Sequence, residues 1–278
     1  MPNVSVIIPT FNRAHLIKES VSSVLAQTFK PKEVIVVDDG SSDKTWDILK
    51  NLGFSLSESR KNTLRYIYKE NGGVSSARNI GIELSSSEYV ALLDSDDQWK
   101  PSKLEAQLSS LKKESFSCRV SHTNEIWIRN GIRVNQHKKH SKNGGDLFEK
   151  CLKMCCISPS SALIHRTVFN DLGGFDESLK ACEDYDFWLR YCAFEETHFL
   201  NEQLTIKNGG HSDQLSQKYW GMDRFRIYSL EKLLKNKNLS RSKYELALTE
   251  LILKLKILMN GSMKRGKKDF TDELNKKI

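Results

Sequence analysis

The chain has 278 residues, with 43 lysines and arginines against 35 aspartates and glutamates, and a formal net charge of +8. This length suits one large α/β domain, or a domain of roughly 200 residues with an appendage. The hydrophobic fraction of 38% and only 5 prolines exclude wholesale disorder, and no apolar run approaches the roughly 20 residues of a membrane-spanning helix.

The N-terminus has no basic leader and its first apolar run stops at Pro9, so we expect no signal peptide. The six cysteines contain no C-x-x-C pair, and we therefore expect reduced thiols in a cytoplasmic protein. Cys151, Cys155 and Cys156 have helical spacing. We interpret them as small apolar side chains on a buried helix, with a metal or redox role as the alternative.

The first hundred residues predict a repeating strand and helix pattern. The expected strands are Val4–Ile8, Val34–Val37, Leu64–Tyr68 and Tyr89–Leu93. The expected helices are Ala14–Gln27, Asp43–Leu52 and Val74–Leu84. Ser42 or Asp43 is the natural N-cap of the second helix. This alternation indicates an α/β fold with a mostly parallel sheet covered on both faces, whose ligands bind after the carboxyl ends of the strands.

The pattern changes after about residue 115. Asn130-Gly131 inside Glu125–Val134 is typical of a β-hairpin. A basic loop at 137–142, a strand at Ser161–Ile164 and a helix at Asp184–Cys192 follow. From Tyr219 onward the chain is expected to be mainly helical, with a lysine-rich tail after residue 261.

The strand ends carry polar motifs that exclude two common nucleotide sites. Pro9-Thr10-Phe11-Asn12-Arg13 stands where a dinucleotide-binding unit would have G-x-G-x-x-G, and no P-loop sequence exists in the chain. These residues form either a plain turn or the lining of a base pocket. Asp38-Asp39 follows the second strand and serves either as a helix cap or as an acceptor for a ribose or a base.

Two further motifs indicate phosphate and metal chemistry. Gly72 and Gly73 open a helix that carries Arg78, and backbone amides with a guanidinium suit a phosphate. Asp94-Ser95-Asp96-Asp97 follows the fourth strand. Three carboxylates in four residues would repel one another, and a hard cation such as Mg²⁺ or Mn²⁺ would relieve that repulsion. A surface acidic turn is the alternative.

Five motifs in this order resemble the family 2 glycosyltransferases, inverting enzymes of the GT-A fold that use nucleotide-diphosphate sugars. The resemblance covers roughly residues 3 to 215. It is carried by residues 4–13, 36–41, 71–79, 93–97 and 183–186.

The resemblance implies roles for the residues of these motifs. The expected nucleotide-sugar contacts are Pro9, Thr10, Asn12, Arg13, Asp39, Gly73, Arg78, Asp94 and Ser95. Asp96 would be the direct ligand of Mn²⁺ or Mg²⁺. His211, in the sequence Asn-Gly-Gly-His-Ser, would be a late metal or phosphate contact, although a loop histidine is equally well a solvated one.

The acidic sequence Glu183-Asp184-Tyr185-Asp186 matches the position of the family's catalytic base. A sugar hydroxyl must lose its proton as it attacks the donor, and a carboxylate near the line of attack can take it. We expect Asp184 to be this base and Glu183 and Asp186 to orient it. Capping of the following helix is the alternative, chiefly for Glu183.

These expectations define a glycosyltransferase with a GT-A domain at 1–218, divided into a nucleotide-sugar half (1–114) and an acceptor half (115–218), and a helical extension at 219–278. The donor would be a UDP-sugar or another nucleotide-diphosphate sugar, and the acceptor a hydroxyl of a glycan or a lipid-linked sugar. The basic C-terminal helices would contact a membrane surface at the cytoplasmic face, pack on the domain itself or form a homodimer.

Three rival functions stay open at this point. A sugar nucleotidyltransferase also joins a nucleotide-binding sheet to an acidic metal site, but it usually has a glycine-rich basic loop where Pro9–Arg13 stands. A non-catalytic nucleotide- or glycan-binding protein would have a broken acidic set. Nucleic-acid binding is disfavoured, because the basic residues are scattered and lack interleaved aromatics.

Overall fold

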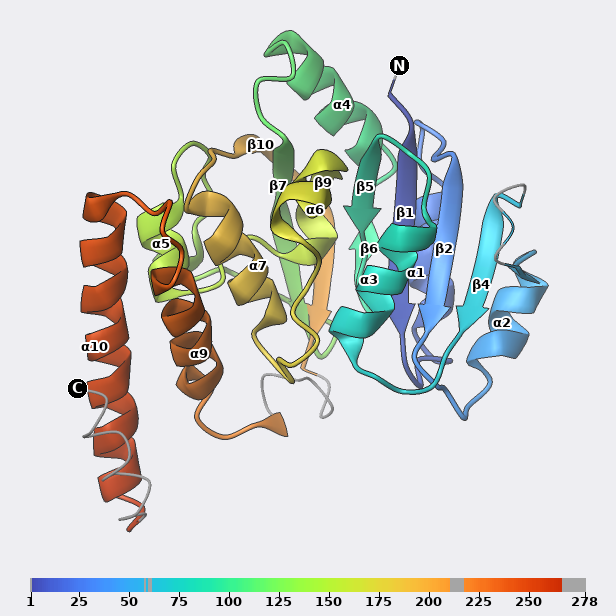
Figure 1. Ribbon diagram of the computed structural model, residues 1–278. Coiled ribbons are helices and arrows are strands. Elements are labelled where there is room, and N and C mark those ends of the chain that lie inside the picture. The colour runs from blue at the N-terminus through green and yellow to red at the C-terminus, as the bar shows by residue number, and fades with distance from the viewer. Residues whose placement is uncertain (1, 58, 60–61, 211–217, 267–278) are drawn as a thin grey trace.

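The computed structural model describes residues 2–57, 59, 62–210 and 218–266. Its strands form one sheet in the order β3-β4-β2-β1-β5-β9-β7-β10-β6, with β8 paired to β7 (Figure 1). The predicted α/β fold with a mixed, mostly parallel sheet between helices is confirmed.

The four predicted N-terminal strands are present and pair in parallel. They are β1 (Val4–Thr10), β2 (Glu33–Asp38), β4 (Leu64–Tyr68) and β5 (Tyr89–Leu92). The short edge strand β3 (Ser55–Leu56) was not predicted. The helices between them are α1 (Ile17–Leu25), α2 (Thr45–Asn51) and α3 (Val74–Leu84).

The predicted cap of α2 needs a correction. Lys44 occupies the N-cap position and makes no side-chain cap, so neither Ser42 nor Asp43 is the N-cap. Asp43 lies one residue earlier, where its carboxylate accepts hydrogen bonds from the Thr45 amide at 3.0 Å and from the Thr45 hydroxyl. It still satisfies a free amide of the first turn.

The second half of the sheet is mixed. It contains β6 (Gln98–Trp99), β7 (Val120–Arg129), β8 (Ile132–Val134), β9 (Ala162–His165) and β10 (His198–Gly209). Strand β9 is antiparallel to both β5 and β7, whereas β10 is parallel to β7. The predicted hairpin is β7 and β8, and its turn residues Asn130 and Gly131 have φ of 49° and 75°, as a tight hairpin turn requires.

Helices surround this half of the sheet. They are α4 (Lys103–Lys113), α5 (Phe148–Lys153), α6 (Thr167–Leu172), α7 (Glu183–Cys192), α9 (Asp223–Leu234) and α10 (Arg241–Met263). Two 3₁₀ turns, at Lys138–His140 and Pro159–Ser161, complete the described elements. The helices expected after Tyr219 are therefore confirmed.

Buried side chains cover both faces of the sheet. Alternate residues of β1 point to opposite faces, because Val6 packs with α1 and α4 whereas Ile7 packs with α3 and the second half of the chain. The C-terminal helices pack against the core that contains Ile7, through Leu230 of α9 and Leu255 of α10. Among the described residues, no helix is both long enough and apolar enough to cross a membrane.

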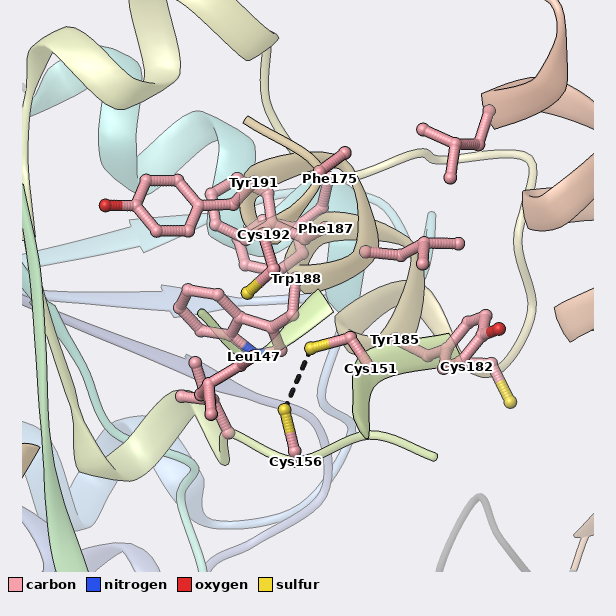
Figure 2. Close-up of a cluster of buried hydrophobic side chains, with 14 of the residues drawn as sticks. Leu147, Cys151, Cys156, Phe175, Cys182, Tyr185, Phe187, Trp188, Tyr191 and Cys192 are labelled. Carbon is pink, nitrogen blue, oxygen red and sulfur yellow. Dashed lines mark hydrogen bonds between the residues drawn. The ribbon is translucent and has the colours of Figure 1, made fainter. Parts of the chain in front are cut away.

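The sequence predicted that Cys151, Cys155 and Cys156 lie on one buried helix, and this prediction is wrong. Helix α5 ends at Lys153, so only Cys151 is helical, while Cys155 and Cys156 follow it. Cys151 and Cys156 are buried with their sulfur atoms 2.8 Å apart, close to Cys192 and the Trp188 ring (Figure 2). Cys155 points elsewhere, toward an acidic residue of the candidate site.

Candidate active site

The carboxyl ends of β1, β2, β4 and β5 lie at the same edge of the sheet, at the bottom of Figure 1. Four of the five sequence motifs follow these strands. The fifth begins helix α7, and a buried arginine of α3 links it to the others. The structure therefore brings together motifs that are about a hundred residues apart in the sequence.

The first loop is tied to the loop after β2. Asn12 has a left-handed φ of 52°, and its amide donates to the Ser41 hydroxyl at 2.7 Å. The Asn12 side chain accepts from the Ser42 amide at 2.9 Å, and the Arg13 amide donates to Thr45 at 3.3 Å. Pro9 and Thr10 belong to the end of β1. The Thr10 hydroxyl is buried and has no hydrogen-bond partner among the described residues.

The adjacent carboxylates Asp38 and Asp39 are both bound by the chain itself. Asp38 is fully buried and accepts from the Ser41 amide and the Tyr66 hydroxyl, each at 2.7 Å. Burial, together with the hydrogen bond to this carboxylate, raises the pKa of Tyr66.

Asp39 organises the glycine loop before α3. Its carboxylate accepts from the amides of Gly72 at 2.9 Å and Gly73 at 2.7 Å, and pairs with Lys69 at 2.6 Å. Gly73 has a φ of 93°, a conformation that side chains with a Cβ rarely adopt. Asp39 therefore holds the loop in place before any ligand arrives.

Arg78 connects the two acidic motifs. It lies on α3 with only 4% of its side chain exposed, and it donates to Asp94 at 2.7 Å and to Glu183 at 2.8 Å. We expected this guanidinium to bind a phosphate, but it donates to the carboxylates of Asp94 and Glu183. Although burial lowers the pKa of Arg78, Asp94 and Glu183 raise it, so the group stays charged.

A second link between these regions comes from Asn79. Its side chain accepts from the Phe175 amide at 2.8 Å and donates to the Phe175 carbonyl at 2.9 Å. A Cβ at Gly174 would lie 2.2 Å from the Asn79 oxygen. The glycine is therefore required for the loop before α7 to approach α3.

The acidic residues after β5 point in different directions. Asp97 is buried and accepts from the Ser160 hydroxyl at 2.6 Å and the Asn208 amide at 3.0 Å, so it holds the 3₁₀ turn at Pro159–Ser161 and the end of β10. Ser95 accepts through its carbonyl from Ser20 at 2.8 Å. Asp94 pairs with Arg78. Within the described residues, the carboxylates of Asp94 and Asp97 have side-chain or backbone partners, whereas that of Asp96 forms no hydrogen bond or ion pair with another residue.

Asp96 therefore suits a cation. Burial and the nearby charge of Asp94 raise the pKa of its carboxyl group, although Lys207 and Arg13 act against this rise. In the part of the chain that the structure describes, no three histidine, cysteine or acidic side chains converge as a complete metal cage. One free carboxylate still fits Mg²⁺ or Mn²⁺, because these ions share their coordination with substrate phosphates. His211 lies outside the described residues.

The acids at the start of α7 take separate roles. The N-cap residue, Cys182, has a left-handed φ of 62° and makes no side-chain cap. Glu183 is buried against Arg78 and does not cap the helix. Burial and the adjacent Asp184 raise the pKa of Glu183, although Arg78 opposes this effect. Asp186 pairs with Arg190 at 2.9 Å and with Lys232 of α9 at 2.7 Å, so it fixes α7 to α9.

Asp184 lines a cavity of about 210 Å³. Its carboxylate accepts from the Tyr185 amide at 2.7 Å and from the Cys155 thiol at 3.2 Å. Burial and the negative charge of Asp184 raise the pKa of Cys155, so the thiol stays protonated and can donate. Asp184 is thus the acid of this motif that faces open space.

Comparison with known proteins identifies the family. The model of Glycosyl transferase family 2 matches residues 5–173. The chain belongs to this family.

Among the relatives, an uncharacterized glycosyltransferase of Rickettsia typhi is 36% identical over 217 residues, which cover 77% of this chain and 65% of the relative. The UDP-Glc:alpha-D-GlcNAc-diphosphoundecaprenol beta-1,3-glucosyltransferase WfgD of Escherichia coli is 37% identical over 186 residues, covering 67% of this chain and 68% of the relative. The chain spans between 31% and 65% of the length of the first five curated relatives.

Solved structures support the fold. S. aureus TarS 1–349 in complex with UDP-GlcNAc has a TM-score of 0.71 and 23% sequence identity, and the match covers 91% of this chain and 72% of TarS 1–349. A second crystal structure of S. aureus TarS 1–349 has a TM-score of 0.69 and 22% identity, and the match covers 91% of this chain and 71% of that chain. At this level of identity the match establishes the GT-A type of fold.

The sequence analysis missed one charged residue of the candidate site, Lys207. Lys207 of β10 lies 3.8 Å from Asp97 and has 31% of its side chain exposed. Burial would lower the pKa of Lys207, but Asp97, Glu125, Asp94 and Asp96 raise it. Lys207 pairs with Trp127 in the sheet register, so only knowledge of the β7–β10 pairing would have revealed it.

Proposed function

We propose that the chain is an inverting glycosyltransferase. It transfers a sugar from a nucleotide-diphosphate sugar, with a UDP-sugar favoured, to a hydroxyl of a glycan or lipid-linked acceptor. The observation that carries this proposal is the buried Arg78, which binds both Asp94 of the Asp94-Ser95-Asp96 sequence, a D-x-D motif, and Glu183 of the Glu183-Asp184 motif. The names of the relatives support it, since WfgD uses a UDP-sugar and a diphosphate-linked acceptor.

In the proposed reaction, the acceptor hydroxyl oxygen attacks C1 of the donor sugar. The bond from C1 to the diphosphate oxygen breaks and its electron pair leaves with the diphosphate, while the hydroxyl proton passes to the carboxylate of Asp184. One displacement of this kind inverts C1. Cys155 and the Tyr185 amide orient the base, because they hold its two oxygens.

On the donor side, the loop held by Asp39 and the residues Pro9, Thr10, Asn12 and Arg13 surround the nucleotide in this proposal. Asp96, with His211 as a further candidate, would hold Mn²⁺ or Mg²⁺. When bound, the ion would stabilise the charge that develops on the leaving diphosphate. Asp94 and Ser95 precede Asp96 in the loop after β5, and in this proposal they position that loop beside the diphosphate.

The proposal also assigns domains and surroundings. Residues 1–218 form the GT-A domain, with donor contacts in 1–114 and acceptor contacts in 115–218, and 219–278 form a helical extension. We propose that the enzyme is cytoplasmic and that its C-terminal helices contact either the inner face of the cell membrane or a second copy of the chain. The exposed Leu253 and Ile257 of α10 are compatible with either a membrane surface or a second copy of the chain.

A donor screen tests this function. UDP-, GDP-, CDP- and dTDP-sugars are supplied with a panel of acceptors, and the anomeric configuration and linkage of the products are determined. Transfer should stop with EDTA and return with Mn²⁺, and Asp96→Ala should lose most activity while Glu149→Gln, on the exposed surface of α5, keeps it. Metal-free activity of Asp96→Ala would contradict the metal role. Formation of a nucleotide-sugar from a nucleoside triphosphate would instead favour a nucleotidyltransferase.

A further inference from the structure

Two thiols lie side by side at the cavity of about 210 Å³ that contains Asp184. Cys151, in the last turn of α5, and Cys156, which follows this helix, have their sulfur atoms 2.8 Å apart (Figure 2). A disulfide bond is roughly 2.05 Å long, so a small shift would join the two. The proposed glycosyl transfer uses neither thiol, and apolar packing alone does not require two sulfur atoms in contact.

A metal ion does not account for this pair. In the ranges of the chain that the structure describes, no three histidine, cysteine or acidic side chains converge on a point that could hold an ion. Cys155, the neighbour of Cys156 in the chain, is turned toward Asp184 and does not complete such a group. The chemistry that suits two thiols in contact is oxidation to a disulfide.

Cys156 is the thiol of the pair that an oxidant can reach. It lines the cavity together with Lys142 and Lys150, whereas Cys151 lies behind it. The hydrogen bond from Cys151 lowers the pKa of Cys156 against the effect of burial, and the two lysines lower it further. Hydrogen bonds with Cys156 and Cys192, together with burial, raise the pKa of Cys151. The nucleophilic thiolate therefore forms at Cys156, with a neutral thiol beside it.

The two partly exposed cysteines, Cys118 and Cys155, are less suited to this reaction. Burial and the negative charge of Glu114 raise the pKa of Cys118. Burial and the negative charge of Asp184 raise the pKa of Cys155 well above its ordinary value. If exposure alone decided which thiol reacts, Cys118 would react before the buried Cys156. The identity of the first oxidised residue therefore distinguishes the two explanations.

The segment between the two thiols carries a contact to the proposed base, because Cys155 donates to Asp184 at 3.2 Å. Helix α5 is held in place by the Tyr185 hydroxyl, which donates to one of its carbonyls at 2.8 Å. The Cys156 carbonyl accepts from the side chain of Lys142 at 2.9 Å, and this long side chain can follow a small shift. Approach of the sulfur atoms would therefore move the residues after α5, and Cys155 with them.

We propose that Cys151 and Cys156 form a reversible disulfide when a hydroperoxide oxidises Cys156, and that this bond lowers turnover by displacing Cys155 from Asp184. The formation of the disulfide does not depend on the proposed function. Its effect on turnover rests on the proposed glycosyl transfer, in which Asp184 is the base.

The oxidation consists of two balanced steps. First, the Cys156 thiolate attacks one oxygen of hydrogen peroxide, the O–O bond breaks, and the hydroxide that leaves takes up the proton that Cys156 had released. Second, the Cys151 sulfur attacks the sulfenic acid on Cys156, the S–O bond breaks, and the hydroxide that leaves takes the Cys151 proton. Two thiols and one peroxide thus give one disulfide and two waters, and a dithiol reductant reverses the change by exchange.

The first test treats the reduced full chain with hydrogen peroxide, blocks the remaining thiols with iodoacetamide and maps the peptides by mass spectrometry. We expect a disulfide between Cys151 and Cys156 that dithiothreitol removes. Cys151→Ala should stop at a sulfenic acid on Cys156, which dimedone traps. Cys118→Ala is the matched control and should form the disulfide as the wild type does. Oxidation of Cys118 in place of Cys156, or a disulfide that uses Cys155, would overturn the inference.

The second test measures turnover before and after peroxide treatment, with the donor and acceptor found in the screen. We expect kcat of the wild type to fall roughly tenfold and to recover with dithiothreitol, because one hydrogen bond to a charged group is lost. The KM of the donor should stay unchanged. Cys155→Ala already lacks this hydrogen bond, so it should form the disulfide with a much smaller change in kcat.

Two outcomes would refute the effect on the base: a disulfide that leaves kcat of the wild type unchanged, or an equal fall in kcat in Cys155→Ala. If Cys151→Ala does not fold, the peptide map of the wild type still decides whether the disulfide forms. Absence of transfer with every donor and acceptor would instead contradict the proposed function, and the same map would still decide the disulfide.

Discussion

The edge of the sheet proposed to bind the donor and the two cavities proposed to bind the acceptor, of about 210 Å³ beside Asp184 and about 440 Å³ along the β7–β8 hairpin, are built on opposite principles. We call them the donor edge and the acceptor cavities. At the donor edge, carboxylates predominate and most are held by groups of the chain, as Asp39 is by two amides and Asp94 by Arg78. Around the acceptor cavities, cations predominate and several face open space, as Lys138 does. The donor side is thus organised in advance around negative charge, and the acceptor side is open and positive.

This difference explains why two adjacent acids can have different roles. Glu183 belongs to the donor-side network through Arg78, whereas Asp184 faces the acceptor cavity. Successive residues in the first turn of a helix point about 100° apart, so one turn can serve both regions. Substitutions in each region should therefore change different measured quantities.

The largest effect is expected at Asp184. Asp184→Asn keeps the shape of the side chain but removes its basicity, and general base catalysis contributes about 10²–10⁴-fold. We expect kcat to fall by that factor while nucleotide affinity, measured by calorimetry, stays nearly unchanged. Glu183→Gln keeps the base and should lose less. Normal turnover of Asp184→Asn beside an inactive Glu183→Gln would reverse the two roles.

The second-largest effect is expected at Glu125, in the wall of the acceptor cavities, and concerns how the stability of the fold depends on pH. Burial would raise the pKa of Glu125, but Lys142 and Lys207 hold it at about 2, below its ordinary value of 4.5. A lowered pKa stabilises the fold above pH 4.5, and this contribution disappears as the pH falls toward 2. The lowered pKa of Glu125 thus contributes about 3 kcal/mol to the free energy of unfolding at neutral pH.

Glu125→Gln should therefore lower the free energy of unfolding by about that amount at pH 7, with a deficit that shrinks as the pH falls through about 4.5 to 3. Urea unfolding of the variant and wild type at several pH values measures this difference, and groups common to both cancel. Glu149→Gln, on the exposed surface of α5, serves as the control. A deficit independent of pH would mean that Glu125 acts through packing alone.

The smallest effect is expected at Asp39. Asp39→Asn leaves the Gly72 and Gly73 amides with a weaker acceptor and loosens the loop before α3. We expect nucleotide binding to weaken by about 1–3 kcal/mol, the usual effect of an imperfectly satisfied polar group. Calorimetry with UDP, GDP, CDP and dTDP measures the change. Unchanged affinity for all four would show that the donor side does not depend on this carboxylate.

Most of the fold was predictable from the sequence because its signals are local. The strands and helices of the first hundred residues follow from apolar runs and turn residues, and the Asn130-Gly131 hairpin follows from its turn. Strand β3, with two residues at the sheet edge, is too short to leave such a pattern. The prediction of the N-cap of α2 was wrong because the helix begins two residues later than the polar residues before it suggest.

The sequence predicted which residues belong to the candidate site better than it predicted which of them contact one another. The motifs located the acidic residues, but the link from Arg78 to Glu183 joins residues 105 positions apart and has no local signal. Lys207 was missed for the same reason, since its neighbours come from β7 and the loop after β5. Cys155 was assigned to a helix interior by its spacing, whereas the end of α5 directs it to Asp184.

The position of Arg78 limits how the protein can be recombined. A hybrid that takes residues 115–266 from a relative, in order to exchange the acceptor, receives the partner of a buried guanidinium from the foreign half. If that half brings no carboxylate at position 183, the hybrid retains a buried cation with one of its two anions missing, a loss that typically costs about 3–5 kcal/mol. Acceptor exchange between relatives is therefore best attempted with Arg78, Asp94 and Glu183 transferred as one unit.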